Sequence, residues 1–476
     1  MCFPGPTKTN EARIDVSAPW LAGSAILMLG FKGTRNWVYP QWIDGRFQRL
    51  RRWTFLALHL VLFLTPWLSI GGNPVLRFDL HDRRLYAFGA MFTAADTLLL
   101  LLLLLFLAFS LFFFTSLYGR LWCGYACPQT VFLEAWVRPI ERWLEGERNT
   151  RLRRDQEPWN LDRALRKGAK WTLFLLAAFI VSMSFMSYFA GARELWAGRA
   201  GPVEYALVGI FTVGWFWDFA WFREQFCNFL CPYARFQSVL QDANTLTITY
   251  DPSRGEPRGR DAKRSGRCID CGKCVAVCPA GIDIRNGFQL ECLGCAACVD
   301  ACDSVMTRLG HTTLVAYGTL NQLQGRRTRG LRARAAAYGG LLAGLATAAL
   351  VLLLLRVPFE ASVARAPGSL YTVDDDGYVR NTFLLRIANN SGAADSALFT
   401  LAVELEGLPQ AELFAPDVAL APEEGRLVPL VVRVLAQHAA DRTIPLRVHI
   451  ASPGGARVLN TTFKSGGGIA HIATAP

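Results

Sequence analysis

Long apolar runs separated by polar, mostly basic segments organise the first three quarters of the chain. A helix that crosses a bilayer core of ~30 Å needs about 20 apolar residues. Five stretches approach that length, although the first is short and contains Pro66 near its end. We expect membrane-spanning helices at Thr54–Ile70, Ala94–Leu117, Trp171–Ala190, Glu204–Phe222 and Ala336–Leu355.

After Pro358 the pattern changes to short segments in which apolar and polar residues alternate. Residues rich in Asn, Gly, Pro and Asp separate these segments. Alternation with a period of two, bounded by turn residues, is typical of strands in an antiparallel sandwich. The sequence therefore predicts a β-sandwich of roughly 100–120 residues, with strands at Val379–Ala388, Leu398–Leu405, Arg426–Leu435 and Ile444–Ala451.

The net charge of +12 is explained by membrane topology rather than by nucleic-acid binding, because the basic residues lie beside apolar runs and no nucleic-acid-binding motif is present. Lys and Arg number 8 before the first span, 11 between spans two and three, and 16 between spans four and five. The other two loops hold only 3 and 2, and the C-terminal tail holds 10. The positive-inside rule then places the N-terminus and both long loops in the cytoplasm, and five spans place the C-terminal domain in the periplasm.

Twelve of the thirteen cysteines fall into regular spacings, and all thirteen lie on the predicted cytoplasmic side or at its membrane boundary, where thiols stay reduced. Eight form two copies of C-x2-C-x2-C-x3-C, the spacing of bacterial two-cluster ferredoxins. In that arrangement three cysteines of one copy hold one cluster and the fourth reaches the other cluster. We therefore expect two [4Fe–4S] clusters, the first held by Cys268, Cys271, Cys274 and Cys302, and the second by Cys292, Cys295, Cys298 and Cys278. Two zinc sites would require paired C-x2-C units rather than triplets.

The other four regularly spaced cysteines form two C-x3-C-P motifs. Cys123 and Cys127 follow the second predicted span, and Cys227 and Cys231 follow the fourth. Residues i and i+4 share one face of a helix, and the proline then breaks or kinks it. Two such pairs on neighbouring helices form a four-thiolate site, which suits a third iron–sulfur cluster or Cu(I) because both favour soft thiolate ligands. The alternative is structural or transient redox thiols.

Other residues carry weaker signals. His59 lies inside the first predicted span without a second intramembrane histidine, which favours a satisfied or snorkelling side chain over a haem ligand. Met183 and Met186 could bind Cu(I), but apolar packing is the simpler interpretation. Asp96 and Asp218 lie near membrane boundaries, where solvation would account for both.

These elements divide the chain into six expected parts. They are a cytoplasmic segment (1–53), a membrane domain with four helices and both C-x3-C-P motifs (54–250), a flexible polar linker (251–266), a cytoplasmic ferredoxin-like domain (267–335), a fifth span (336–356) and a periplasmic sandwich (357–476). The fold class is thus a multi-domain membrane protein: an α-helical bundle with an inserted α+β ferredoxin-like domain and a C-terminal immunoglobulin-like β-sandwich.

With these motifs in place, the chain resembles the cytochrome c oxidase accessory protein CcoG family, also called FixG or RdxA. The resemblance runs nearly end to end. It includes Val38–Arg51, Gly119–Thr130, Arg223–Arg235, Arg267–Asp303 and Asp376–Ala388. The order of motifs is more specific than the membrane part alone, because related polyferredoxins of nitrate and nitrous-oxide respiration also carry C-x3-C-P pairs. Cys2 has no counterpart in the pattern.

The resemblance implies a role in assembling a cbb3-type haem–copper oxidase by reducing Cu(II) to Cu(I). It also implies that Cys123, Cys127, Cys227 and Cys231 are the catalytic copper site or the ligands of an extra cluster. Oxidase subunits or a copper chaperone are the expected partners, and the bacterial inner membrane is the expected location. A scaffold role, or electron transfer between a cytoplasmic donor and membrane quinone, are the alternatives. Because no nucleotide or flavin motif is present, we expect the donor to be another protein or a small reductant.

Overall fold

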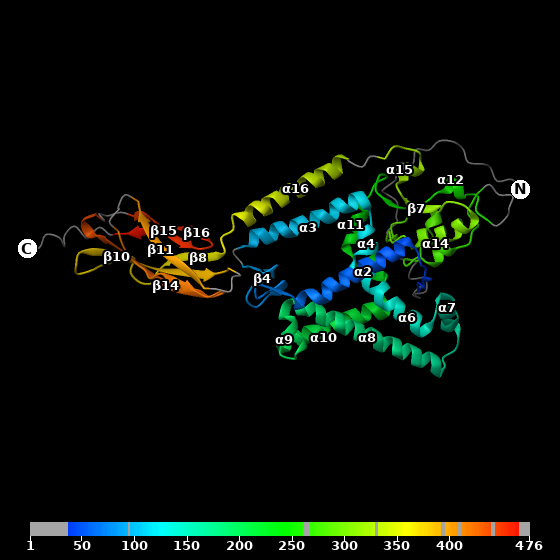
Figure 1. The fold of residues 1–476 in the computed structure, drawn as a ribbon, viewed down its shortest axis with the longest axis horizontal. Coiled ribbons are helices and arrows are strands. Elements are labelled where there is room, and N and C mark those ends of the chain that lie inside the picture. The colour runs from blue at the N-terminus through cyan, green and yellow to red at the C-terminus, as the bar shows by residue number, and fades with distance from the viewer. Residues whose placement is uncertain are drawn as a thin grey trace, which may run out of the picture. The chain divides into compact units, whose positions relative to one another are not determined.

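The computed structural model describes residues 37–93, 96–259, 266–328, 332–391, 396–406, 411–438 and 443–465 (Figure 1). The chain forms two compact units, each assembled from three segments. The cysteine unit comprises Met1–Leu56, Phe114–Ala177 and Val213–Arg332. The sandwich unit comprises Ala57–Phe113, Ala178–Thr212 and Ala333–Pro476. Cys2 lies outside the described residues.

Four helices are long and apolar enough to cross a membrane. They are α3 (Thr97–Tyr118), α8 (Leu161–Ala190), α10 (Pro202–Trp217, continued by η4, Asp218–Phe222) and α16 (Ala333–Leu354). These helices confirm four of the five apolar stretches as candidate spans. None of the most apolar part of α3 or α16 is buried within the chain, as expected of helices whose side chains meet lipid.

The first predicted span differs from the structure. Helix α2 covers Arg46–Leu64 and passes into a short 3-10 turn, η1 (Thr65–Trp67). Its first two turns hold four arginines, so only Thr54–Leu64 is apolar, about 16 Å of helix at ~1.5 Å per residue. Pro66 ends the helix because it has no N–H for the carbonyl of Leu62, and the Tyr188 hydroxyl donates to that oxygen instead at 3.1 Å. At 19 residues α2 is long enough to count as a candidate span, but among the described residues the arginines of its first two turns exclude it by composition.

The sandwich unit contains two antiparallel sheets, and the four predicted strands are confirmed. The first sheet has the order β12-β14-β10-β8, with β9 paired to β10, and the second has the order β13-β11-β15-β16. The strand bounds are β8 Phe359–Arg365, β9 Thr372–Val373, β10 Tyr378–Asn389, β11 Ala397–Leu405, β12 Glu412–Phe414, β13 Val418–Leu420, β14 Gly425–Leu435, β15 Thr443–Ser452 and β16 Gly455–Lys464. Phe383 and Val432 of one sheet and Phe399 and Leu446 of the other are fully buried in one core. This is an immunoglobulin-like β-sandwich.

A small sheet near the membrane helices was not predicted. It consists of β3 (Leu76–Asp79), β4 (Arg84–Ala87) and β5 (Ala90–Phe92), preceded by the pair β1 (Ser69–Ile70) and β2 (Asn73–Pro74). Glu423 of the sandwich accepts hydrogen bonds from Arg84 at 2.8 Å and from the Tyr86 hydroxyl at 2.9 Å. Asp96 pairs with Arg356 at 2.9 Å, so the expectation that this carboxylate is simply solvated is wrong. The remaining helical turns of this unit are α9 (Ala192–Trp196) and η8 (Ala436–His438).

The cysteine unit is built from short helices and one two-stranded ladder. Strand β6 (Thr247–Tyr250) pairs antiparallel with β7 (Val315–Gly318), which brings together the two ends of the ferredoxin-like segment. The helices are α4 Leu121–Tyr125, α5 Pro128–Phe132, η3 Leu133–Val137, α6 Arg138–Glu145, α7 Arg148–Gln156, η5 Phe226–Leu230, α11 Pro232–Leu240, α12 Pro252–Gly255, α13 Lys273–Ala276, η6 Ile284–Asn286, α14 Ala297–Met306, η7 Thr307–Leu309 and α15 Leu320–Leu323.

The predicted linker 251–266 is not a free tether over its described part. Asp251 caps α12 through the N–H groups of Ser253 and Arg254, and Arg254 also donates to the carbonyl of Thr313 at 2.9 Å. The backbone N–H of Gly259 donates to the carbonyl of Cys268 at 2.8 Å. Residues 251–259 are therefore packed against the cysteine loop and its surroundings, because the helix cap and the turn form hydrogen bonds with polar residues whose composition predicts a flexible chain.

Candidate metal centre

The two halves of the ferredoxin-like segment repeat one backbone conformation. In each half the residues on either side of the middle cysteine have positive φ: Asp270 (52°) and Gly272 (67°) around Cys271, and Gly294 (66°) and Ala296 (58°) around Cys295. Such left-handed residues turn the chain sharply. The turn lets three cysteines spaced three residues apart face one space. The short helices α13 and α14 then begin directly after the turns.

Electrostatic interactions link seven of the eight cysteines, all but Cys268, into two neighbouring groups. Cys274 interacts electrostatically with Cys271 and Cys302, whereas Cys298 interacts with Cys295, Cys292 and Cys278, and more weakly with Cys274. This arrangement fits the predicted division of ligands between two clusters. The division itself stays a prediction.

The thiols of these groups are poorly suited to exist as free thiolates. Burial, with a contribution from neighbouring cysteines, raises the pKa of Cys274 and of Cys292 to about 12. Burial likewise raises the pKa of Cys278 to about 11. Thiolates are the metal-binding form, so bound iron would supply the positive charge that this buried site lacks. The donor set therefore fits an iron–sulfur group.

The structure brings the two C-x3-C-P motifs together. Cys227 interacts electrostatically with Cys127, Cys123 and Cys231. Cys123 lies in α4, but Cys127 is an extended residue that precedes α5. The expectation that the two cysteines lie on one continuous helix is therefore wrong. Cys231 likewise stands before α11, and Pro128 and Pro232 occupy the first turns of these helices. Burial raises the pKa of Cys127, and the helix-starting N–H groups of Thr130 and Gln129 oppose this shift only in part.

Polar contacts tie one motif to the other. The side-chain amide of Gln129 donates to both carboxylate oxygens of Asp218 and to the carbonyl of Arg223, each at 2.9 Å. Asp218 is only 7% exposed, so the expectation that it is solvated is wrong. Gln237 in α11 lies 3.5 Å from the Cys123 sulfur. A residue that follows the second motif thus contacts the first motif, and residues that flank the two motifs are hydrogen-bonded to each other.

A buried ion cluster holds the turn that leads into the second motif. Arg223 has a φ of 50° and joins η4 to η5. Its guanidinium pairs with Glu141 at 2.7 Å, and Glu141, 1% exposed, also pairs with Arg151 at 2.7 Å. Lys170 lies 3.9 Å from the same carboxylate. Burial alone would raise the pKa of Glu141, but Arg223, Arg151 and Lys170 lower it to about 2.

The first C-x3-C-P motif packs directly on the second cysteine loop of the ferredoxin-like segment. A Cβ atom on Gly124 would lie 2.7 Å from the carbonyl oxygen of Leu293 and 2.9 Å from the Cα of Cys295. Arg51 donates to the carbonyl of Gly124 at 2.9 Å, and Gln48 donates to the carbonyl of Cys295 at 3.2 Å. The membrane cysteines and the predicted ligands of one cluster therefore share a tight backbone interface.

Sequence reasoning singled out the cysteines but missed the residues that position them. Gly124 lies inside the motif, and Gln129 directly follows its proline, so both positions were visible in the pattern. Arg51, Glu141 and Arg223 carry no such signal because their partners are remote in sequence.

The weaker candidates are placed as follows. Met183 and Met186 are buried in an apolar cluster with Leu195 and Val208, which agrees with apolar packing. His59 stacks on Phe63 with ring centroids 5.9 Å apart. Across the residues that the structure describes, no three His, Cys, Asp or Glu side chains are grouped closely enough to hold a single metal ion.

Comparisons with known proteins find three family matches within the chain. Residues 222–319 match a family described as a 4Fe-4S dicluster domain, and residues 99–147 match a 4Fe-4S binding domain. Residues 349–465 match the IG-like fold at the C-terminal of FixG. The chain is 33% identical to the nitrogen fixation protein FixG of Rhizobium meliloti, over 94% of this chain and 92% of that protein. It is 36% identical to protein RdxB of Cereibacter sphaeroides (80% and 86% covered) and 35% identical to protein RdxA (78% and 82%).

Gly124→Ala tests the interface between the membrane motif and the cysteine loop. The added Cβ lies closer than 3.0 Å to backbone atoms of Leu293 and Cys295, so one backbone must move, at a cost of about 1–3 kcal/mol. We expect lower iron and acid-labile sulfide per chain than in wild type. Gly168→Ala is the matched control, because nothing lies within 4 Å of its Cβ position. Equal iron content in the two variants would contradict the prediction.

Glu141→Gln tests the buried ion cluster. Removing the carboxylate leaves Arg223 and Arg151 buried without a shared counter-ion, which costs about 3–5 kcal/mol. We expect a lower thermal unfolding midpoint in detergent, whereas Glu157→Gln, at an exposed ion pair, leaves it nearly unchanged. Because the folded pKa of Glu141 lies below its ordinary value of 4.5, its stabilisation is present above that pH and is lost as the pH falls toward about 2. The difference in thermal unfolding midpoint between wild type and Glu141→Gln should become smaller as the pH falls through the same range. A difference that does not change with pH would argue against this role of Glu141.

Proposed function

Because the chain belongs to the FixG/RdxA family of membrane iron–sulfur electron-transfer proteins, we propose that it reduces Cu(II) to Cu(I) for assembly of a cbb3-type cytochrome c oxidase. The observation that carries the proposal is the group of four interacting cysteines of the C-x3-C-P motifs, packed through Gly124 on the loop that bears Cys295. Soft thiolates bind Cu(I) in preference to harder ions, so this group would favour the reduced product. Each Cu(II) ion takes up one electron, which originates from a cytoplasmic donor.

Two [4Fe–4S] clusters, held by Cys268, Cys271, Cys274 and Cys302 and by Cys292, Cys295, Cys298 and Cys278, would supply one-electron redox chemistry when bound. The chain's own contribution is to fix the distance between the membrane cysteines and the second loop. Gln48, Arg51 and Gly124 do this through hydrogen bonds and backbone packing. The oxidase subunits or a copper chaperone are the proposed recipients of Cu(I).

A second reading of the membrane cysteines is that they hold a third iron–sulfur cluster. It is favoured by the family match over residues 99–147, described as a 4Fe-4S binding domain, because this stretch contains Cys123 and Cys127. In that case the four cysteines serve electron transfer, and copper is reduced elsewhere on the protein.

Metal analysis separates the two readings. Iron, acid-labile sulfide and copper would be measured in anaerobically purified wild type and in a Cys123/Cys127/Cys227/Cys231→Ser variant. About eight iron in both proteins, with copper retained and Cu(II) reduced only by wild type, would support copper reduction at the thiolates. About twelve iron falling to eight would assign a third cluster instead. Equal copper retention and equal reduction of Cu(II) by both proteins would rule out the proposed copper site.

We also propose that the cysteine unit is cytoplasmic, that the sandwich is periplasmic, and that α2 crosses the membrane as a fifth helix. The backbone N–H of Gln48, in the first turn of α2, donates to Asp300 at 2.9 Å inside the cysteine unit. Near the other end of α2, the Tyr188 hydroxyl donates to the carbonyl of Val61 at 3.0 Å inside the sandwich unit. The chain passes between the units at α2, α3, α8, α10 and α16, and the excess of Lys and Arg falls in the cysteine-bearing loops.

Protease treatment of spheroplasts tests this topology. With epitope tags at both ends of the chain, we expect the C-terminal tag to be digested and the N-terminal tag to be protected until the membrane is permeabilised. Digestion of both tags would mean that α2 does not cross. Protection of the C-terminal tag alone would reverse the orientation.

A further inference from the structure

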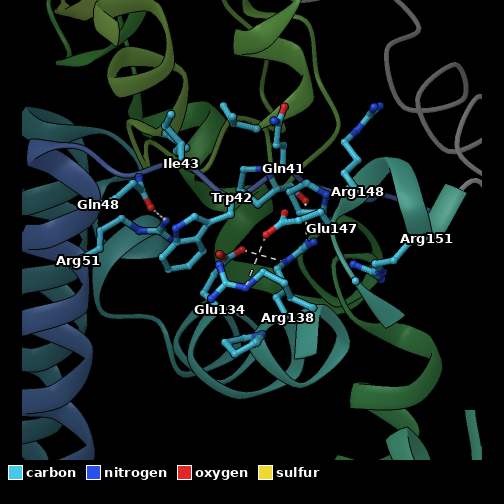
Figure 2. Close-up of a pocket in the computed structure, with 17 residues that line it drawn as sticks. Gln41, Trp42, Ile43, Gln48, Arg51, Glu134, Arg138, Glu147, Arg148 and Arg151 are labelled. Atoms are coloured by element: carbon cyan, nitrogen blue, oxygen red, sulfur yellow. Dashed lines mark hydrogen bonds and ion pairs between the residues drawn. The ribbon is translucent and has the colours of Figure 1, made fainter. Parts of the chain in front are cut away.

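An arginine-lined pocket lies in the cysteine unit, and none of the described residues that line it is a cysteine, although Val277, Pro279 and Ala297 adjoin Cys278 and Cys298. We call it the arginine pocket. Its volume is about 60 Å³, and its lining includes Arg51, Arg138, Arg142, Arg148 and Arg151. Figure 2 shows Gln48 and Arg51 on α2 at one side and Arg148 and Arg151 at the other. Gln48 and Arg51 also position the second cysteine loop, but the proposed function gives no role to the space that they line.

The walls of the pocket are joined to the cysteine loop. The backbone N–H of Gln41 donates to the carbonyl of Ala276 at 2.8 Å, and Arg138 donates to the carbonyl of Pro279 at 3.3 Å. The pocket is therefore a fixed part of the folded unit and not a gap between loops that pack independently.

Positive charge exceeds negative charge in the lining. Its two carboxylates are those of Glu134, 2.9 Å from Arg138, and Glu147, 4.0 Å from Arg142. Arg151 pairs with Glu141, outside the lining. Within the described part of the chain, no ion pair engages the two remaining arginines, Arg51 and Arg148.

Both of these arginines carry a buried donor that lacks a hydrogen-bond partner among the described residues: Nη2 of Arg51 and Nε of Arg148. Arg51 is only 2% exposed. A buried, charged donor without a partner is costly, and a bound anion removes the cost. Guanidinium groups match the geometry of phosphate, to which they donate paired hydrogen bonds. A water molecule needs roughly 10–15 Å³ by this measure of volume, so the pocket holds a group of about phosphate size.

We propose that the arginine pocket binds a phosphate group, supplied by the headgroup of an anionic phospholipid or by free inorganic phosphate. The same turns of α2 that carry Arg51 lead into Trp53, 70% exposed, and Leu56, 48% exposed. An exposed tryptophan beside arginines is typical of the membrane interface, where basic pockets hold lipid headgroups. Both sources present the same oxyanion to the same arginines.

The test uses the full-length protein with the Arg148→Gln variant, because Arg51 also donates to Gly124 and so has a structural role. One arm titrates inorganic phosphate into lipid-stripped protein in detergent by calorimetry. The other arm reconstitutes the protein in discs of phosphatidylcholine, alone or mixed with phosphatidylglycerol, and measures the retained lipid by mass spectrometry. We expect wild type to bind in at least one arm, and Arg148→Gln to bind about tenfold more weakly.

Arg153→Gln is the matched control, since Arg153 lies on the same helix, α7, but is 75% exposed and outside the lining. It should bind like wild type. If Arg148→Gln does not fold, as judged by iron content, Arg142→Gln replaces it. Binding of inorganic phosphate alone would identify the free anion, and selective retention of phosphatidylglycerol would identify the lipid. The absence of binding in both arms, or equal binding by the lining and control variants, would overturn the proposal.

Discussion

The buried carboxylate of Glu141 is the contact on which the candidate metal centre depends. It pairs with Arg223, whose left-handed backbone turns the chain from the end of α10 and η4 into the second C-x3-C-P motif. The carbonyl of Arg223 accepts from Gln129, which directly follows the first motif. A carboxylate on α6 thereby fixes the position of one cysteine pair relative to the other. A buried ion pair adds little to the free energy of unfolding compared with apolar residues of the same size, whereas removing one partner is strongly destabilising. The role of this pair is therefore to fix the geometry of the two motifs rather than to add stability.

Close backbone packing then sets the distance between the membrane cysteines and the ferredoxin-like segment. Gly124 has no Cβ, and its place against Cys295 leaves no room for one. The facing loop makes its own sharp turn with Gly294 and Ala296, both left-handed. Because both segments have small residues at the contact, their backbones approach more closely than those of two helices with larger side chains could. This close approach suits the electron transfer that we propose between the second cluster and the membrane cysteines.

Much of this architecture could be predicted from local patterns, because hydropathy and cysteine spacing act over a few residues. Four candidate spans, four strands of the sandwich and the iron–sulfur motifs were identified in that way. The failures concern contacts between remote positions. Asp218 and Asp96 were expected to be solvated, but their partners Gln129 and Arg356 lie far away in sequence. Pro66 was noted near the end of Thr54–Ile70, but the apolar count still extended the predicted span beyond it to Ile70, whereas α2 ends at Leu64. The strands of two to four residues in the small sheet are too short to show alternation.

The abundance of arginine affects both the membrane insertion of the chain and the neutralisation of charge in its folded interior. A surplus of positive charge in the loops next to the spans favours their retention in the cytoplasm during insertion. Once the chain folds, those same arginines must be neutralised wherever they become buried. Glu141 neutralises Arg151 and Arg223, and Glu134 neutralises Arg138. Among the described residues, Arg148 and Arg51 have no carboxylate partner, and an anion from the membrane surface or from the cytoplasm can neutralise them.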